Sequence, residues 1–176
     1  MFNIFKNKSV IENNLYNNIL LLSRNKLFFT KFNLSDTFHN RINLIFIHIS
    51  FLFNKVKYID QKNIYKEFYQ KMFDYIFKKI ELNMREIGYG DVSVNKNMKF
   101  LVRSFYDILL NCEKYKKKSP ILKQSFFYKH LTFVGVKNGN FDDLLIDYFD
   151  KYEAFCLDLS SDSVLKGEIK FNYKKI

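Results

Sequence analysis

The sequence has 176 residues, of which 48% are hydrophobic and 27% charged, and its net charge is +11. This length and apolar content suit a folded domain with a buried core and exclude an intrinsically disordered chain. The longest apolar stretch, residues 42–53, is about a dozen residues long and contains polar residues, so it is too short to span a bilayer. Residues 1–9 lack the apolar segment of a signal peptide, which predicts a soluble or peripheral protein.

The positive charge has two explanations that the sequence leaves open. Lysine greatly outnumbers arginine, and a lysine-rich surface favours anionic partners such as RNA or lipid headgroups. The abundant Lys, Asn, Ile and Phe also have AT-rich codons, so genome composition alone would produce the same excess of positive charge. The charge by itself therefore identifies no partner.

Apolar residues at helical spacing predict a first helix over residues 12–23, followed by a mixed connection over 24–34. Ser35, Asp36 and Thr37 then supply short side-chain oxygens that suit the N-terminus of a second helix, which runs to about residue 56. Apolar residues fall on nearly every side of this second helix. We therefore expect it to lie at the centre of the domain or to present one face to a partner.

A long amphipathic helix is predicted over residues 61–87. Gly88 suits the left-handed conformation that ends a helix, and Arg85 suits the negative end of the helix dipole. Asp91 or Ser93 is expected to cap a fourth helix that runs to about residue 112. The sequence therefore predicts a tight helix–helix corner at residues 88–91.

The C-terminal third also has a helical pattern. A basic linker at residues 114–118 precedes Ser119 and Pro120, which predict the start of a fifth helix over about 121–133. A turn at 135–140 leads to a sixth helix that begins near residue 141, and a short helical turn at 162–165 precedes an irregular tail. The predicted fold class is all-α, a single compact domain of about six helices over residues 1–176.

Residues that carry chemistry are scattered along the chain. His39, His48 and His130 lie on different predicted elements, so no zinc site is expected, and His48 is expected to be a buried or half-buried histidine with a hydrogen bond. Cys112 and Cys156 are far apart in apolar contexts, which predicts buried free thiols. No nucleophile–base pair stands out, so the sequence indicates a non-enzyme without metal or cofactor.

Charged residues gather around the predicted corner. Gly88 and Gly90 do not form a dinucleotide-binding fingerprint, because they follow a long helix and the third glycine is missing. Glu86 and Asp91 are placed to approach either Arg85 or Arg41 and to form a buried ionic network, whose default role is structural.

The same corner carries the most specific motif of the chain, Met84-Arg85-Glu86-Ile87-Gly88-Tyr89-Gly90-Asp91-Val92-Ser93-Val94. It is preceded by Asp36-Thr37 with Arg41 and by the apolar run that contains His48. It is followed by Lys96, Met98 and Lys99 and then by Ser104-Phe105-Tyr106. In order and spacing these motifs resemble the ubiquinol–cytochrome c reductase (complex III) chaperone family. The resemblance is best over residues 15–110, and the helical part at 119–166 is compatible with it.

The resemblance implies a non-catalytic, all-helical assembly factor that binds newly made cytochrome b near the membrane. Further partners to be considered are a ribosome, an anionic membrane surface and a small partner subunit. DNA is not expected as a partner. No transit peptide is evident, which favours a bacterial protein that is cytoplasmic or peripheral on the inner face of the inner membrane. The positions carried over from the family motif for partner binding are Asp36, Thr37, Arg41, His48, Arg85, Glu86, Gly88, Gly90, Asp91, Phe105 and Tyr106.

The chain departs from the family pattern at several places. Asp107-Ile108 stands where the family has Gly-Arg, Asn40 replaces the glycine before Arg41, and Lys79-Ile80-Glu81 replaces an acidic run. Any interface that depends on those residues would differ in this chain.

Two other classes of function remain as alternatives. A basic RNA- or ribosome-binding helical module would use the lysines and aromatic residues of 114–118 and 171–175 to grip phosphates and stack on bases. A helical enzyme would need polar groups that converge in a pocket, which the sequence alone does not reveal.

Overall fold

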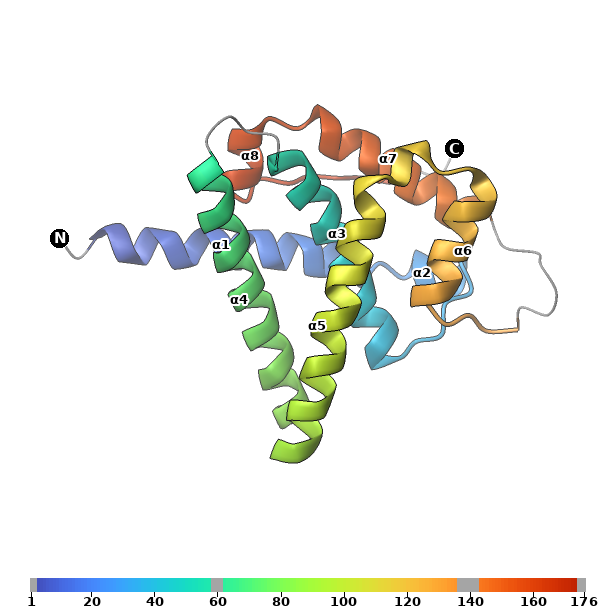
Figure 1. Cartoon of the computed structure of the whole chain (residues 1–176), viewed down its shortest axis with the longest axis horizontal. Helices are drawn as coiled ribbons and strands as arrows, with labels where there is room; N and C mark the ends of the chain where they lie inside the picture. Colours follow the sequence, from blue (N-terminus) through green and yellow to red (C-terminus); the bar gives the residue numbers. More distant parts are fainter. Residues whose placement is uncertain (1–2, 58–61, 136–142, 174–176) are drawn as a thin grey trace.

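The computed structural model describes residues 3–57, 62–135 and 143–173, and Figure 1 shows how its helices are arranged. In chain order these are α1 Asn3–Ser23, α2 Leu27–Thr30, α3 Phe38–Val56, α4 Lys62–Glu86, α5 Asp91–Glu113, the 3-10 helix η1 Tyr115–Lys117, α6 Pro120–His130, α7 Asp143–Asp158 and α8 Ser161–Leu165. Within the described residues, six helices have 11 or more residues and no strand is present. The predicted all-α class with about six helices is confirmed.

Helix α3 is the central element of the fold. All of its residues from 42 to 53 are buried, and it contacts α1, α4, α5, α7 and α8. Thr37 caps its N-terminus by accepting a hydrogen bond from the backbone amide of Asn40 at 3.2 Å. The all-round apolar pattern of this segment therefore belongs to a helix that is covered on all sides.

Helices α4 and α5 form a hairpin that narrows toward the corner between them, and this corner projects from the rest of the molecule (Figure 1). The hairpin packs on α3 through apolar side chains at helical spacing, such as Ile76 and Ile80 on α4 and Leu101 and Phe105 on α5. Every residue from 85 to 93 is exposed. The specific sequence motif is thus displayed at the end of the hairpin.

The C-terminal segment closes the fold against α1. Helix α7 packs on α3 and α6 and buries most of its aromatic side chains. After α8 the chain passes close to α1, where a Cβ on Gly167 would lie 3.1 Å from the carbonyl oxygen of Ile11 and from the amide nitrogen of Leu15. The side-chain amide of Asn18 donates to the Gly167 carbonyl at 2.9 Å, which fixes the tail to α1.

Several element ends differ from the sequence prediction. Helix α1 begins at Asn3 rather than near residue 12, and α2 lies within the predicted connection. Helix α6 ends at His130 instead of 133, because the next residues are extended and pair with the chain before α3: the Ser35 amide donates to the Thr132 carbonyl at 2.9 Å. The predicted start of a helix near residue 141 lies outside the described residues.

None of the helices in the described ranges is long and apolar enough to cross a membrane. Cys112 and Cys156 are buried and free, as predicted. Burial raises the pKa of both thiols, so both are protonated and poorly nucleophilic at neutral pH.

Candidate functional site

The motif of residues 84–94 makes the corner between α4 and α5. At the end of α4 the Gly88 amide donates to the Arg85 carbonyl and the Tyr89 amide donates to the Met84 carbonyl, both at 3.0 Å, which is a Schellman arrangement. Gly88 has φ +94°, in the left-handed region. A side chain at this position would be strained, so Gly88 is required by the turn itself.

The second half of the corner begins α5. Gly90 is the N-cap residue and offers no side-chain acceptor, so the expectation that Asp91 or Ser93 caps this helix is wrong. Asp91 instead lies in the first turn, where its carboxylate faces the positive end of the helix dipole and pairs with Nη1 of Arg85. Arg85 also donates from Nη2 to Oε1 of Glu81 at 2.9 Å. Hydrogen bonds from Arg85 to Asp91 and Glu81 raise the pKa of the guanidinium.

This ionic cluster lies at the surface, because the corner projects beyond the helices that could cover it. The side chains are 43% exposed for Arg85, 41% for Glu81 and 80% for Asp91. The predicted buried network is therefore wrong in its burial. Of the two cations that were open as partners, Arg85 pairs with Asp91, whereas Arg41 pairs with Asp36.

Asp36 and Arg41 form a separate pair at the start of α3. Arg41 donates from Nε to Oδ1 of Asp36 at 2.6 Å and from Nη2 to Oδ2 at 2.9 Å, a bidentate geometry. These hydrogen bonds hold the pKa of Asp36 below its usual value. The guanidinium carbon also lies 5.3 Å from the ring centroid of Phe29. The pair and the ring together fix the direction of the Arg41 side chain.

Arg41 borders a pocket of about 220 Å³ between α1, α3 and α4. Buried apolar side chains form part of its lining, among them Tyr16, Ile42 and Ile45, and the exposed Ile87 lies at its edge. Its polar lining consists of Ser23, Arg24, Arg41, Asn83 and Glu86. The pocket thus brings together two positions of the family motif, Arg41 and Glu86, which come from different helices.

His48 lies in the core rather than in this pocket. It is fully buried, its Nδ1 is 2.6 Å from the Leu44 carbonyl oxygen, and its Nε2 is 2.9 Å from the Tyr148 hydroxyl. Desolvation lowers the pKa of His48 to about 4, so the ring is neutral at neutral pH. The neutral ring donates from Nδ1 and accepts at Nε2, which joins α3 to α7.

Phe105 and Tyr106, the last two motif positions, point in different directions. Phe105 is buried, with its ring centroid 5.2 Å from that of Phe46 and 5.5 Å from that of Phe73. Tyr106 is 45% exposed on the outer side of α5. Phe105 holds the hairpin to the core, whereas Tyr106 is half-exposed, with its ring centroid 6.0 Å from that of Phe73 on α4.

Comparison with known proteins identifies the family. The sequence model of the family described as Ubiquinol-cytochrome C chaperone matches residues 30–132, which is more than half of the chain. The chain belongs to the ubiquinol-cytochrome c chaperone family. Its members are non-catalytic chaperones for the assembly of ubiquinol–cytochrome c reductase, and the matched range contains every motif position from Asp36 to Tyr106.

The fold of this chaperone is also found in a solved structure. The crystal structure of the Cbp3 homolog from Brucella abortus superposes with a TM-score of 0.78 and 21% sequence identity, over 96% of this chain and 92% of that one. The shared fold therefore extends beyond the matched range to α1 and α7. A comparison with curated protein sequences finds no match.

Two buried asparagines, Asn40 and Asn43, position the chaperone motif, and the sequence marks only Asn40, as a departure from the family pattern. The side-chain nitrogen of Asn40 donates to the carbonyls of Ser35 and Thr132 at 2.7 Å each, and its oxygen accepts from the Thr132 amide at 2.9 Å. Asn43 donates to the His130 carbonyl at 2.6 Å. Their signal in the sequence is a pair of amides three residues apart at the start of the apolar run of α3, which predicts buried polar partners.

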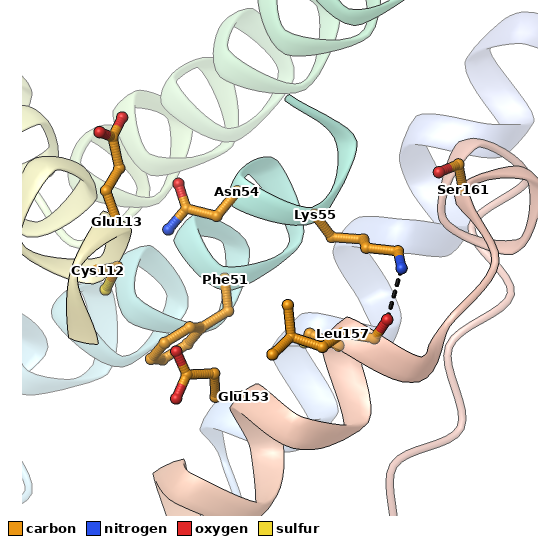
Figure 2. Close-up of a pocket in the computed structure, with 9 residues that line it drawn as sticks. Phe51, Asn54, Lys55, Cys112, Glu113, Glu153, Leu157 and Ser161 are labelled. Carbon is orange, nitrogen blue, oxygen red and sulfur yellow. Dashed lines mark hydrogen bonds between the residues drawn. The ribbon is translucent and has the colours of Figure 1, made fainter. Parts of the chain in front are cut away.

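A second pocket, of about 320 Å³, lies between α3, α5, α7 and α8 (Figure 2). Its cation Lys55 donates to the carbonyl of Leu157, and its carboxylate Glu113 pairs with Lys57 at 2.6 Å. Burial raises the pKa of Glu153, and the two thiols that line the pocket are protonated. Within the ranges that the structure describes, no group of three His, Cys, Asp or Glu side chains is placed to hold a metal ion.

Proposed function

We propose that this chaperone binds newly made cytochrome b, and that it does so as a peripheral protein at the inner face of the membrane. Its client surface comprises the pocket between α1, α3 and α4 together with the adjoining corner. One observation carries this proposal: Arg41 and Glu86, from separate parts of the family motif, border a single pocket whose lining is largely apolar.

The size of this pocket indicates what it accepts. At about 220 Å³ it is smaller than the sites of about 300–1,000 Å³ that enclose drug-sized ligands, so it suits one apolar anchor side chain of a polypeptide. The rim places the guanidiniums of Arg24 and Arg41 near that anchor, where they can bind backbone carbonyls or a carboxylate of the client. This mode resembles recognition of an apolar helix by a groove with a polar rim.

Exposed apolar residues extend the surface from the pocket along the corner. Ile87 and Tyr89 are 59% and 41% exposed. Exposed apolar side chains beside a pocket of this kind extend the surface on which an apolar segment can be covered. A membrane protein such as cytochrome b presents apolar segments before insertion, and these need temporary cover.

The test is site-specific photo-cross-linking in cells that are translating cytochrome b. A photoreactive residue at Ile87 is expected to capture pulse-labelled cytochrome b. The matched control is Ile121, which is 73% exposed on α6 away from the pocket lining and is expected to capture much less. Equal capture at both positions would show that the pocket is not the client site.

Deletion of the gene tests the function itself. Loss of cytochrome b and of haem b absorbance, with the other respiratory complexes intact, is the expected result. Normal levels of both would contradict the proposal and would favour the competing RNA- or ribosome-binding function.

The basic segment 114–118 that this competing function would use is partly engaged in contacts within the fold. There Lys118 donates to Oδ1 of Asn111 at 2.9 Å and lies 5.2 Å from the ring centroid of Phe126.

A further inference from the structure

The outer side of α5 carries a regular row of exposed residues, which we name the α5 outer stripe. Its members recur at alternating spacings of four and three residues, so they lie on one face of the helix. They are Val92, Lys96, Lys99, Arg103, Tyr106 and Leu110. All are exposed, and at about 1.5 Å per residue the stripe is about 27 Å long. Cations occupy its middle and apolar side chains its two ends.

The three cations of the stripe are not neutralised within the fold. None of Lys96, Lys99 and Arg103 has a carboxylate within 4 Å among the described residues. Unpaired cations on one face make a positive field that attracts an anionic surface.

The acids of α5 are engaged elsewhere. Asp91 pairs with Arg85, Asp107 lies 2.6 Å from Nζ of Lys129, and Glu113 lies 2.6 Å from Nζ of Lys57. The exposed Glu86 before the corner borders the pocket between α1, α3 and α4 instead. The stripe therefore keeps its positive charge.

The chemistry of the stripe favours a lipid surface over the other anionic occupants. Val92 and Leu110, which are 84% and 64% exposed, are aliphatic side chains of the kind that enter the boundary between headgroups and acyl chains. Tyr106 is the one member of the stripe with a ring on which a base could stack, whereas single-strand binding uses several such rings in succession. A second copy of the chain is disfavoured, because it would place cations against cations. In Figure 1 the corner end of α5 projects from the rest of the molecule.

We propose that the α5 outer stripe docks the protein on an anionic bilayer, with Lys96, Lys99 and Arg103 at the lipid phosphates and with Val92 and Leu110 at the edge of the acyl region. This inference rests on the proposed peripheral function and names the surface that performs it. It places the helix along the membrane plane and leaves the pocket between α1, α3 and α4, which has no lining residue on α5, free for a client.

Vesicle co-sedimentation of the purified full-length protein tests the inference without any client. The protein is expected to bind phosphatidylcholine vesicles that contain about one third phosphatidylglycerol, to bind pure phosphatidylcholine vesicles far less, and to dissociate at high salt. The variant K96E/K99E/R103E is expected to bind the anionic vesicles on the order of 100-fold more weakly. The matched control K31E/K166E/K170E makes the same change of net charge at exposed lysines elsewhere and is expected to change binding by less than about threefold.

The possible results of these experiments distinguish a lipid surface from RNA and from a second copy of the chain. They also distinguish failure of this inference from failure of the proposed function. Equal loss in both triple variants would overturn the stripe and indicate a diffuse charge effect. Failure to bind anionic vesicles, together with binding of single-stranded RNA that the stripe variant loses, would assign the stripe to RNA. Sedimentation equilibrium would detect self-association through the stripe, which would also overturn the inference. If vesicle binding fails while deletion still removes cytochrome b, the stripe is wrong and the client function stands.

Discussion

At the scale of single residues, the corner contains two glycines with different physical roles. Gly88 has φ +94° and Gly90 has φ −73°, and a Cβ on either would meet no atom within 4 Å. Gly88→Ser should therefore lower the free energy of unfolding by about 1–2 kcal/mol through backbone strain alone. Gly90→Ser should leave it unchanged or raise it by a few tenths of a kcal/mol, since serine adds an N-cap acceptor. Urea unfolding of the two variants checks the pair; equal destabilisation would refute the assignment of strain to Gly88.

His48 makes stability depend on pH with a definite sign. Its pKa is about 4 in the fold and 6.5 as the unperturbed value, so below pH 6.5 the unfolded chain binds the proton more readily. The stabilisation is complete above pH 6.5 and is lost as the pH falls toward 4; between about pH 7 and about pH 5 the loss is about 2 kcal/mol. His48→Gln should remove this part of the pH dependence. The pKa values of His39 and His130 are lowered too, so the difference between the two proteins isolates His48. Denaturant unfolding at a series of pH values measures this for both proteins. If the free energy of unfolding falls equally with pH in the two, His48 is not a neutral, buried residue.

At the scale of elements, periodicity and turn chemistry predict most of the helices but not how they are joined. The extent of α3 and the corner at Gly88 follow from local pattern, because both depend on residues close in sequence. The end of α6 does not, since Thr132 leaves the helix to pair with Ser35. The pocket between α1, α3 and α4 also cannot be predicted from local pattern, because its lining depends on how these helices pack against one another. The ion pair of Arg85 and Asp91 is exposed rather than buried, because the hairpin projects from the rest of the molecule. This projection cannot be read from residues close in sequence.

The connection between the start of α3 and the end of α6 depends on Asn40. Asn40→Ala would leave the carbonyls of Ser35 and Thr132 without this donor and the Thr132 amide without its acceptor, at a site where the asparagine is fully buried. We expect a loss of about 2–4 kcal/mol in the free energy of unfolding. The control Asn95→Ala changes an exposed asparagine of α5 and should stay within about 0.5 kcal/mol. A small effect of Asn40→Ala would mean that water replaces the amide.

At the scale of the whole molecule, the two proposed surfaces lie on different elements, with the pocket on α1, α3 and α4 and the α5 outer stripe on α5. A chaperone that holds a membrane protein at the bilayer needs both surfaces on one molecule, because the client must be released where it inserts. Ile87→Asp should abolish client capture and keep vesicle binding, since Ile87 is exposed at the pocket edge and absent from the stripe. The variant K96E/K99E/R103E should keep client capture and lose binding to anionic vesicles.

Co-expression of these two variants in cells that lack the wild-type gene should therefore fail to restore cytochrome b, as measured by haem b absorbance and immunoblot. Each variant would supply one surface, and no molecule would carry both. Full restoration would contradict this coupling and would mean that client binding and membrane docking act on separate copies of the chain. A variant with both changes, expressed beside the wild-type protein, controls for dominant effects and should leave cytochrome b at its normal level.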